Sequence, residues 1–506
     1  MAKFNKKDNS GEQIENHPDR IKEGNYEGGT AFEMGDELKL YTQVCSCLVG
    51  EPKFYGNVLV QHSDLVQLIR KVAAQDPAYV AKLAVYVRHK MNLRSIAVML
   101  LVELANTSSA KDSGLIRRTT PQVVSRADEL TEVMAYQFNI FGRTKINNGL
   151  RRGLADAFTK FDAYQLAKYD RKGEVKLKDV LKMVRPKPTT EEQSKLWKML
   201  KEDNLPIPDT WEVVISTKGS TKENWEAIIP KMGTMAKLRN LRNFLEKGCD
   251  ISVVMKELED PEVIRKSKQL PFRFFSAYKA VEEVDGSFDC PEVLEALSNA
   301  LELSITNVPT FDGNTVVAVD LSESMTSYLS SRSSVSYKDV ASVMGAIAVK
   351  RNPNNIIYGF GQIIAQIPLN KGSSVMDIIQ KIGDTDVGHS TNGYLVLQDM
   401  ITKKIKADRI MLFSDMQLYS DTGFWERHDS FATLWKKYKK SINPKAKLYS
   451  FDLAGYGQST IPQDEKGTYL LAGWSEKVFD FVRAMEEDPA IAVKTIKEMD
   501  LNVRQK

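Results

Sequence analysis

The ten residues from 315 to 324, TVVAVDLSES, indicate the fold class of the second half of the chain. The run Thr315–Val319 consists of small and β-branched residues, as expected for a buried parallel strand. It ends in Asp320, and the DxSxS loop that begins there also contains Ser322 and Ser324. One carboxylate and two hydroxyls are oxygen donors that suit a hard cation such as Mg²⁺. The stretch therefore predicts a strand that leads into a metal-binding loop.

Similar apolar runs predict three more strands: NIIYGFG at 355–361, RIMLFSD at 409–415 and KLYSFDLAG at 447–455. Helical patterns lie between and around them, at Lys338–Lys350, Val375–Ile382, Tyr394–Ile405 and Phe431–Lys440. This alternation is typical of a doubly wound α/β sheet, in which ligands collect at the carboxyl ends of the strands. Because the pattern starts near Pro309–Asn314, we expect a domain boundary there.

Two further loops supply oxygen donors at predicted strand or helix ends. Asp415 ends the run RIMLFSD, and Ser390-Thr391 precedes the predicted helix Tyr394–Ile405. In order and spacing, the three loops resemble the metal-ion-dependent adhesion site of von Willebrand A-type domains, over residues 312–483.

The resemblance implies a divalent cation, most simply Mg²⁺, that is held by Asp320, Ser322 and Ser324, with Thr391 and Asp415 acting directly or through water. An open coordination position would take a carboxylate of a partner protein. The alternative is that these groups only cap helices and bond to one another. His389 stands where relatives have a glycine, and it either contacts the ion or is a solvated loop residue.

The chain from about residue 36 to 300 has apolar residues at helical spacing, as in Leu65, Leu68, Ile69 and Val72. Asp76-Pro77 is typical of an N-cap followed by a first helical turn. Short helices that each bury one stripe against their neighbours predict an α-solenoid with an extended binding surface.

Positive charge is concentrated in one part of this helical half. The whole chain carries a net charge of +4, yet Arg143–Lys187 alone holds thirteen Lys or Arg against five Asp or Glu. A basic segment on a nearly balanced chain favours a polyanionic partner, nucleic acid above all.

The helical half resembles the TROVE domain of Ro proteins in a series of segments: Asn25–Glu33, Leu48–Glu51, Phe54–Tyr55, Gly149–Ala157, Lys168–Pro188, Met235–Leu241 and Leu270–Phe272. The resemblance implies a monomeric HEAT-like repeat ring, 21–308, next to the A-type domain at 312–483. Residues 1–20 are polar and are expected to form a disordered tail, and residues 484–506 are expected to form a C-terminal tail or closing helix. The resemblance also implies that Y-like RNA binds on the outer surface and that single-stranded 3′ ends of misfolded noncoding RNAs bind in the central hole.

Individual RNA contacts also follow from the resemblance. Lys168 matches a position implicated in Y RNA contact, Arg171 or Lys172 stands near a second one, and Arg185 replaces a histidine of relatives. The full candidate set is Lys168, Arg171, Lys172, Arg185, Lys187, Arg239 and Arg242, the last two as candidates for the hole. Any single one could instead be solvated, and Arg239 could anchor neighbouring helices.

Other classes of protein fit the sequence less well. It has no apolar run long enough to span a bilayer and no secretory signal, so a cytoplasmic protein without a membrane partner is expected. The sequence contains neither a phosphate-binding loop nor a paired histidine spacing, so we do not expect an enzyme. We expect an RNA-binding protein that acts in noncoding-RNA quality control or hands RNA to a ribonuclease at the metal site. The alternative is a metal-dependent protein-interaction scaffold, and a metal-dependent nuclease is disfavoured.

Overall fold

The computed structural model describes residues 36–46, 63–107, 114–170, 173–207, 210–284, 290–329, 333–351, 355–370, 372–415, 430–454, 467–472, 478–487 and 489–502. These residues form two compact units. The first contains the helices up to residue 207 together with residues 489–502, and the second contains residues 210–487. No helix in these ranges is both long enough and apolar enough to cross a membrane.

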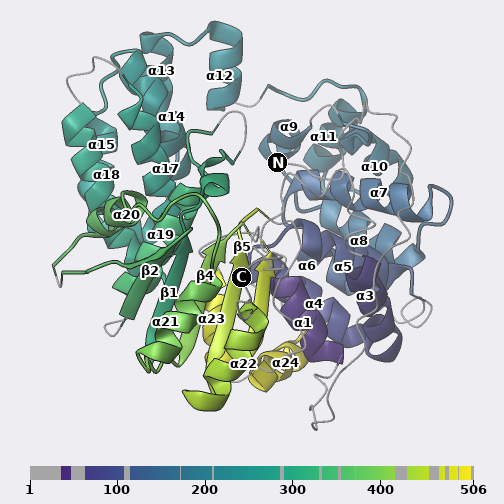
Figure 1. The fold of residues 1–506 in the computed structure, drawn as a ribbon. Coiled ribbons are helices and arrows are strands. Elements are labelled where there is room, and N and C mark those ends of the chain that lie inside the picture. Colours follow the sequence, from purple (N-terminus) through teal and green to yellow (C-terminus); the bar gives the residue numbers. More distant parts are fainter. Residues whose placement is uncertain are drawn as a thin grey trace. The chain divides into compact units, whose positions relative to one another are not determined.

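The first unit is all helical, as predicted (Figure 1). Its helices are α1 (Asp36–Ser46), α3 (Ser63–Gln75), α4 (Pro77–His89), α5 (Ser95–Ala105), α6 (Leu115–Val123), α7 (Ala127–Phe141), α8 (Asn148–Phe158), α9 (Ala163–Tyr169), α10 (Leu177–Val184), α11 (Glu191–Lys201) and α24 (Pro489–Glu498). Neighbouring helices pack on one another, as α4 does on α5 and α6 on α8.

The start of α4 follows the predicted chemistry. The Asp76 side chain accepts a hydrogen bond from the Tyr79 amide at 2.9 Å, and Pro77 opens the first turn. The next helix, α5, is buried from Ile96 to Ala105, which explains its continuous apolar sequence.

The helix α24 packs against α4 in the first unit, although the two are far apart in the sequence. The Lys497 ammonium lies 2.6 Å from a carboxylate oxygen of Glu37 in α1. Beyond the helix, the Leu501 carbonyl accepts a hydrogen bond from the Gln122 side chain. The last described residues are therefore tied to the helices of this unit.

The second unit begins with α12 (Trp211–Lys218), α13 (Lys222–Ile228), η3 (Ile229–Lys231), α14 (Thr234–Glu246), α15 (Ser252–Glu259), α16 (Pro261–Ser267), α17 (Pro271–Glu282), α18 (Cys290–Ser304) and η4 (Ile305–Asn307). Helices α17 and α18 pack against α19 (Tyr337–Lys350) and α20 (Val375–Gly383) of the α/β part. Because of these contacts, the chain divides into its two compact units between α11 and α12. The change of sequence pattern lies further on, near residues 309–314.

The α/β part holds one sheet of strands β1 (Thr315–Asp320), β2 (Asn355–Phe360), β3 (Ile364–Gln366), β4 (Arg409–Ser414), β5 (Lys447–Asp452) and β6 (Thr468–Ala472), in the order β3-β2-β1-β4-β5-β6. Only β3 is antiparallel among these strands. Its other helices are η5 (Glu323–Thr326), α21 (Tyr394–Thr402), α22 (Phe431–Ser441) and α23 (Val478–Glu487). The four predicted strands and four predicted helices are confirmed.

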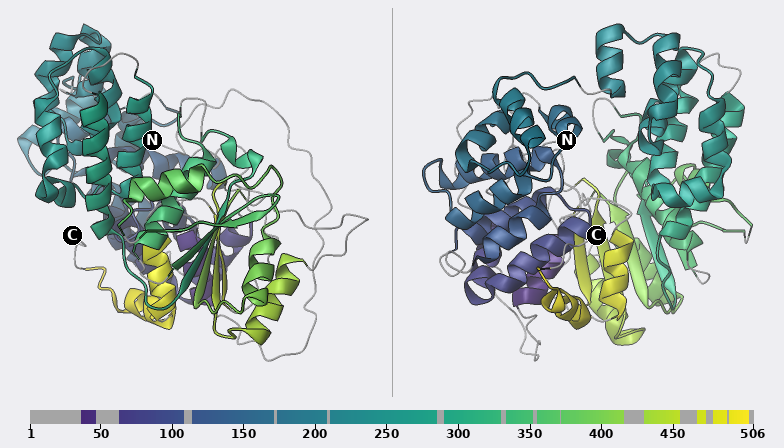
Figure 2. Two further views of the ribbon diagram at one scale, coloured as in Figure 1. Left: turned by 60° about the vertical axis from the view of Figure 1, so that its left-hand side comes forward. Right: turned by 180° about the vertical axis from the view of Figure 1, so that it is seen from behind.

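Helices cover both faces of the sheet (Figure 2). Val316 and Ala318 of β1 belong to a core with Leu397 of α21 and Trp435 of α22. Val319 of β1 faces the opposite side of the sheet, where a Cβ atom on Gly345 of α19 would lie 2.9 Å from its side chain. The alternation of β1 side chains thus serves two helical layers, and the predicted doubly wound α/β fold is confirmed.

Candidate functional site

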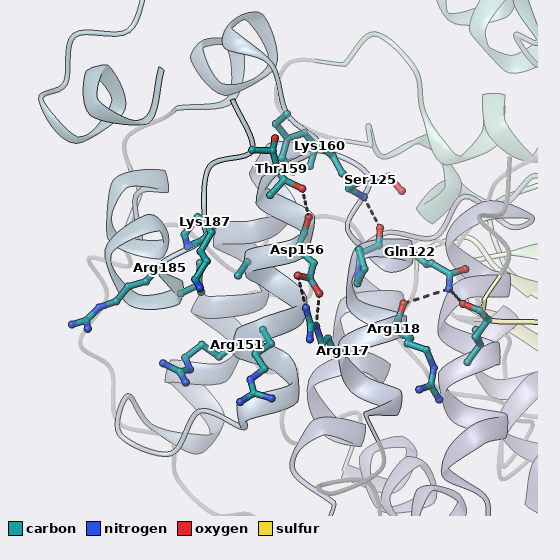
Figure 3. Close-up of a pocket in the computed structure, with 18 of the residues that line it drawn as sticks. Arg117, Arg118, Gln122, Ser125, Arg151, Asp156, Thr159, Lys160, Arg185 and Lys187 are labelled. Carbon is teal, nitrogen blue, oxygen red and sulfur yellow. Dashed lines mark hydrogen bonds and ion pairs between the residues drawn. The ribbon is translucent and has the colours of Figure 1, made fainter. Parts of the chain in front are cut away.

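A pocket of about 1230 Å³ lies in the first unit, between α6, α8 and the segment after α10 (Figure 3). Its lining contains seven basic side chains, from Arg117, Arg118, Arg151, Arg152, Lys160, Arg185 and Lys187. The acidic side chain among the lining residues is Asp156. We call this the arginine pocket.

Two of the seven cations are used to hold the pocket together. The Arg117 guanidinium bonds both carboxylate oxygens of Asp156, at 2.6 and 3.1 Å, and so joins α6 to α8. The Lys160 ammonium donates to the backbone carbonyls of Pro121 and Val124, at and just beyond the end of α6. Figure 3 shows the two bonds between Arg117 and Asp156.

The other five cations have no acidic partner within the part of the chain that the structure describes: Arg118, Arg151, Arg152, Arg185 and Lys187. Arg151 makes a single side-chain hydrogen bond, to the Asn148 amide oxygen at 3.3 Å. All five are exposed to solvent. Gathered charges of one sign raise the local potential and attract anions. Guanidinium groups in particular bind phosphate through two hydrogen bonds.

The two helices that carry four of the arginines pack unusually closely. A Cβ atom at Gly153 of α8 would lie 2.6 Å from both Cβ and Oγ1 of Thr120 in α6. Gly149, one turn earlier, would place its Cβ 3.1 Å from Ile116. Since glycine lets the two backbones approach, the arginine pairs of α6 and α8 can line one pocket.

The segment after α10 brings in the remaining two cations. Arg185 ends this helix in a left-handed conformation, with φ of 49°, and its amide donates to the Leu181 carbonyl at 3.1 Å. Pro186 follows and cannot continue a helix. The chain therefore turns at Arg185, and Arg185 and Lys187 both reach the arginine pocket.

Three other predicted RNA contacts, Lys168, Arg171 and Lys172, are not among the residues that line the pocket. Lys168 is on α9, with its Nζ atom 5.4 Å from the centre of the Tyr164 ring and 5.8 Å from that of Tyr169. Arg171 and Lys172 fall outside the described residues.

Arg239 and Arg242 belong to α14 in the second unit. Arg242 pairs with Glu246 at 2.7 Å and with Glu283 at 3.2 Å, whereas Arg239 is exposed. Since they lie in a different compact unit from the arginine pocket, their assignment to a central hole stays a prediction.

Sequence reasoning did not single out Arg118, Arg151 or Arg152 as contacts. A signal was present, because each lies in an Arg-Arg pair within a helical segment, IRRTT at 116–120 and LRRGL at 150–154. What the sequence did not reveal is that α6 and α8 lie side by side.

The DxSxS loop forms a second polar cluster, at the carboxyl end of β1. Asp320 is fully buried, and its Oδ1 atom accepts from the Ser322 amide at 3.0 Å and from the Ser322 hydroxyl at 2.6 Å. Its Oδ2 atom accepts from the Ser414 hydroxyl at 2.6 Å. Burial raises the pKa of Asp320 to about 6, against the lowering effect of the bonds from Ser322 and Ser414.

The other predicted ligand loops reach the same edge of the sheet. The Glu323 amide donates to the His389 carbonyl at 3.3 Å, which links the DxSxS loop to the loop that contains Thr391. Thr391 and Asp415 are both buried, and Asp415 directly follows β4, the neighbour of β1. The His389 side chain is 84% exposed, which favours the solvated alternative.

The donor set fits a hard cation. Asp320 pairs with no lysine or arginine in the described ranges, so its buried charge lacks a cationic partner there. The Ser322 and Ser324 hydroxyl oxygens lie 3.3 Å apart beside it. These ranges hold no group of three His, Cys, Asp or Glu suited to a metal ion, so hydroxyls would have to complete the ligand set.

Family models match most of the chain. The TROVE domain model matches residues 37–204 and 198–307, and the Ro60 vWA domain model matches residues 314–485. The chain belongs to the Ro family of TROVE-domain proteins.

Several curated proteins are similar to this Ro-family chain. RNA-binding protein RO60 of Deinococcus radiodurans is 20% identical over 447 residues, which cover 78% of this chain and 83% of that protein. RNA-binding protein RO60 of Caenorhabditis elegans is 22% identical over 275 residues, 52% of this chain and 42% of that protein. Telomerase protein component 1 of Mus musculus is 22% identical over 337 residues, but this chain spans only 13% of its length.

A solved structure shares the fold. The crystal structure of the Deinococcus radiodurans RO (RSR) protein matches with a TM-score of 0.66 at 18% identity, and the match covers 82% of this chain and 93% of that chain. The predicted combination of a helical TROVE region and an A-type domain is therefore confirmed.

Proposed function

We propose that this Ro-family protein binds structured noncoding RNA through the arginine pocket. The observation that carries the proposal is the group of five cations, Arg118, Arg151, Arg152, Arg185 and Lys187, without acidic partners in the described chain. The two RO60 relatives are named RNA-binding proteins, which supports the same partner class.

The chemistry of the pocket suits the backbone of folded RNA. An RNA duplex hides its base edges in a deep, narrow major groove, so proteins contact mainly its phosphates and 2′-hydroxyls. Guanidinium groups bind phosphates in a bidentate manner, while the pocket also offers amide and hydroxyl groups from Gln165 and Thr189 for ribose contacts. Recognition of this kind depends on backbone shape more than on sequence.

Within this class we propose Y-like RNA as the bound duplex and misfolded noncoding RNAs with single-stranded 3′ ends as the second ligand. Lys168 of α9 would extend the contact, together with Arg171 and Lys172, which follow α9 in the sequence. The biological role would be noncoding-RNA quality control in the cytoplasm, with handover of RNA to a ribonuclease. The chain itself would bind RNA without cleaving it.

The A-type domain is proposed to dock a protein through a divalent cation, most simply Mg²⁺. Asp320, Ser322 and Ser324 would hold the ion, and Thr391 and Asp415 would complete its surroundings. The bound ion would supply a coordination position for a carboxylate of the partner protein. A second candidate function, a metal-dependent protein scaffold that uses no RNA, rests on this same cluster.

Purification of the full chain, followed by sequencing of its crosslinked RNA, separates the two functions. We expect structured RNA with crosslinks at the arginine pocket. The triple variant R118E/R152E/R185E should lose this RNA at moderate salt while its helical content stays unchanged. A matched control is K195E/K198E/K201E, which makes the same charge change on exposed lysines of α11 outside the pocket. Equal RNA retention by both triple variants would contradict the proposal.

A further inference from the structure

Tyr164 on α9 is an aromatic side chain that the packing of the first unit does not explain. It is 48% exposed. Every other aromatic side chain in the described part of that unit is buried or half-buried. Burial of an aromatic ring away from water is favourable, so a ring that stays in solvent on an ordered helix is available to a ligand.

The residues around Tyr164 fix it beside the arginine pocket. Phe161, three residues before it, and Gln165, the next residue, both line the pocket. The Asp162 carboxylate accepts from the Gln165 amide at 2.7 Å, and the Gln165 side chain accepts from the Asp162 amide at 3.2 Å. This capping box and the buried Phe161 hold the first turn of α9 in place.

A cation contacts the ring, since the Lys168 Nζ atom lies 5.4 Å from its centre. The Lys168 ammonium lies one helical turn on, 3.4 Å from the Tyr164 hydroxyl. The neighbouring Tyr169 ring is already covered by the Arg126 guanidinium, 4.5 Å from its centre. Tyr164 thus combines a half-exposed aromatic ring with an adjacent charge that can take a phosphate. Proteins use this pairing of groups for single-stranded nucleic acids.

We propose that Tyr164 is a stacking platform for one unpaired nucleobase at the edge of the arginine pocket, with Lys168 on the adjoining phosphate. A duplex covers both faces of its bases by stacking, so only a bulged, looped or terminal base offers a free face to the ring. The ligand is therefore a duplex with an unpaired segment next to it. This inference rests on the proposed RNA-binding function, and it names the element of RNA structure that the protein distinguishes.

The test uses the full-length protein and two synthetic RNAs, a blunt duplex and the same duplex with a short unpaired tail that carries 2-aminopurine. We expect Y164A to weaken binding of the tailed RNA by roughly 5- to 150-fold, the range for loss of one base stack. Y164F keeps the ring and should stay within about twofold of the parent protein. Quenching of the 2-aminopurine fluorescence should disappear in Y164A alone, and the blunt duplex should bind all three proteins equally.

The pocket variant R118E/R152E/R185E separates the two claims. If Y164A binds the tailed RNA as tightly as the parent protein while the pocket variant does not bind, the stacking inference is overturned and the RNA-binding function stands. If neither variant changes binding, both are overturned. An equal loss for Y164A on both RNAs would also overturn the inference, because an exposed ring that stacks on an unpaired base cannot affect a blunt duplex.

Discussion

Arg185 combines a functional side chain with an unfavourable backbone conformation. A left-handed conformation costs a residue with a Cβ atom roughly 1–2 kcal/mol, and glycine would avoid this cost at the φ of 49° seen here. The greater freedom of glycine in the unfolded chain offsets roughly 0.5–1 kcal/mol of that gain. We therefore expect R185G to raise the free energy of unfolding by about 0.5–1 kcal/mol and to weaken RNA binding, measured by chemical denaturation and filter binding.

Lys268 provides the matched control. It ends α16 in the second unit, also in a left-handed conformation with φ of 52°, and it does not line the arginine pocket. K268G should stabilise the protein to a similar degree while RNA affinity stays the same. If R185G and K268G have equal effects on RNA binding, Arg185 has no role in the pocket.

Asp320 permits a separate test of the proposed cation. Without a metal ion, its buried carboxylate relies on bonds from Ser322 and Ser414, whereas an amide carries no charge to desolvate. We expect D320N to be at least as stable as the parent protein in EDTA. Millimolar Mg²⁺ should raise the melting temperature of the parent protein but not that of D320N.

The pocket variant R118E/R152E/R185E is the control for this experiment, since it should keep the full response to Mg²⁺. A parent protein whose melting temperature is the same in Mg²⁺ and in EDTA would rule out the metal site and leave the helix-capping alternative.

At the scale of elements, the close approach of α6 and α8 explains why both arginine pairs line one pocket. An alanine in place of a helical glycine usually gains about 1 kcal/mol, but overpacking costs about 1–3 kcal/mol. At Gly153 the new Cβ would lie 2.6 Å from Thr120, so the clash should win. We expect G153A to lower the free energy of unfolding by up to about 2 kcal/mol and to weaken RNA binding, although no cation is removed.

The double variant G153A/T120G removes both clashing atoms and should recover RNA affinity, even though its helix propensity is lower. A G153A protein that is more stable than the parent and binds RNA normally would show that the spacing of α6 and α8 is unimportant.

Individual elements were predictable where one local pattern determines them. Asp76-Pro77 predicts the start of α4 because the cap bond joins residues three apart, and TVVAVD predicts β1 because both of its faces are buried. The three-residue β3 was not predicted, since IAQ is too short to show a pattern. The pairing of α6 with α8 depends on Gly153 lying against Thr120, a contact between distant residues that no local pattern reveals.

For the whole molecule, charge density along the sequence was a useful but imperfect guide to the charged surface. Four of the five pocket cations without an acidic partner among the described residues lie in the basic window Arg143–Lys187, but Arg118 lies outside it. Other cations of the window are paired, as Lys178 is with Asp203 and Arg143 is with Glu174. The folded chain therefore decides which charges remain for a ligand.

The salt dependence of RNA binding is the most direct test of the arginine pocket. Each phosphate neutralised on a duplex contributes a slope of about −0.9 to the plot of log K against log salt concentration. Five phosphate contacts would give the parent protein a slope of about −4 to −5, and R118Q/R152Q/R185Q should reduce it to about −2. If the slope is the same in the parent protein and the triple variant, the arginine pocket does not bind the phosphates, because they must then be bound elsewhere.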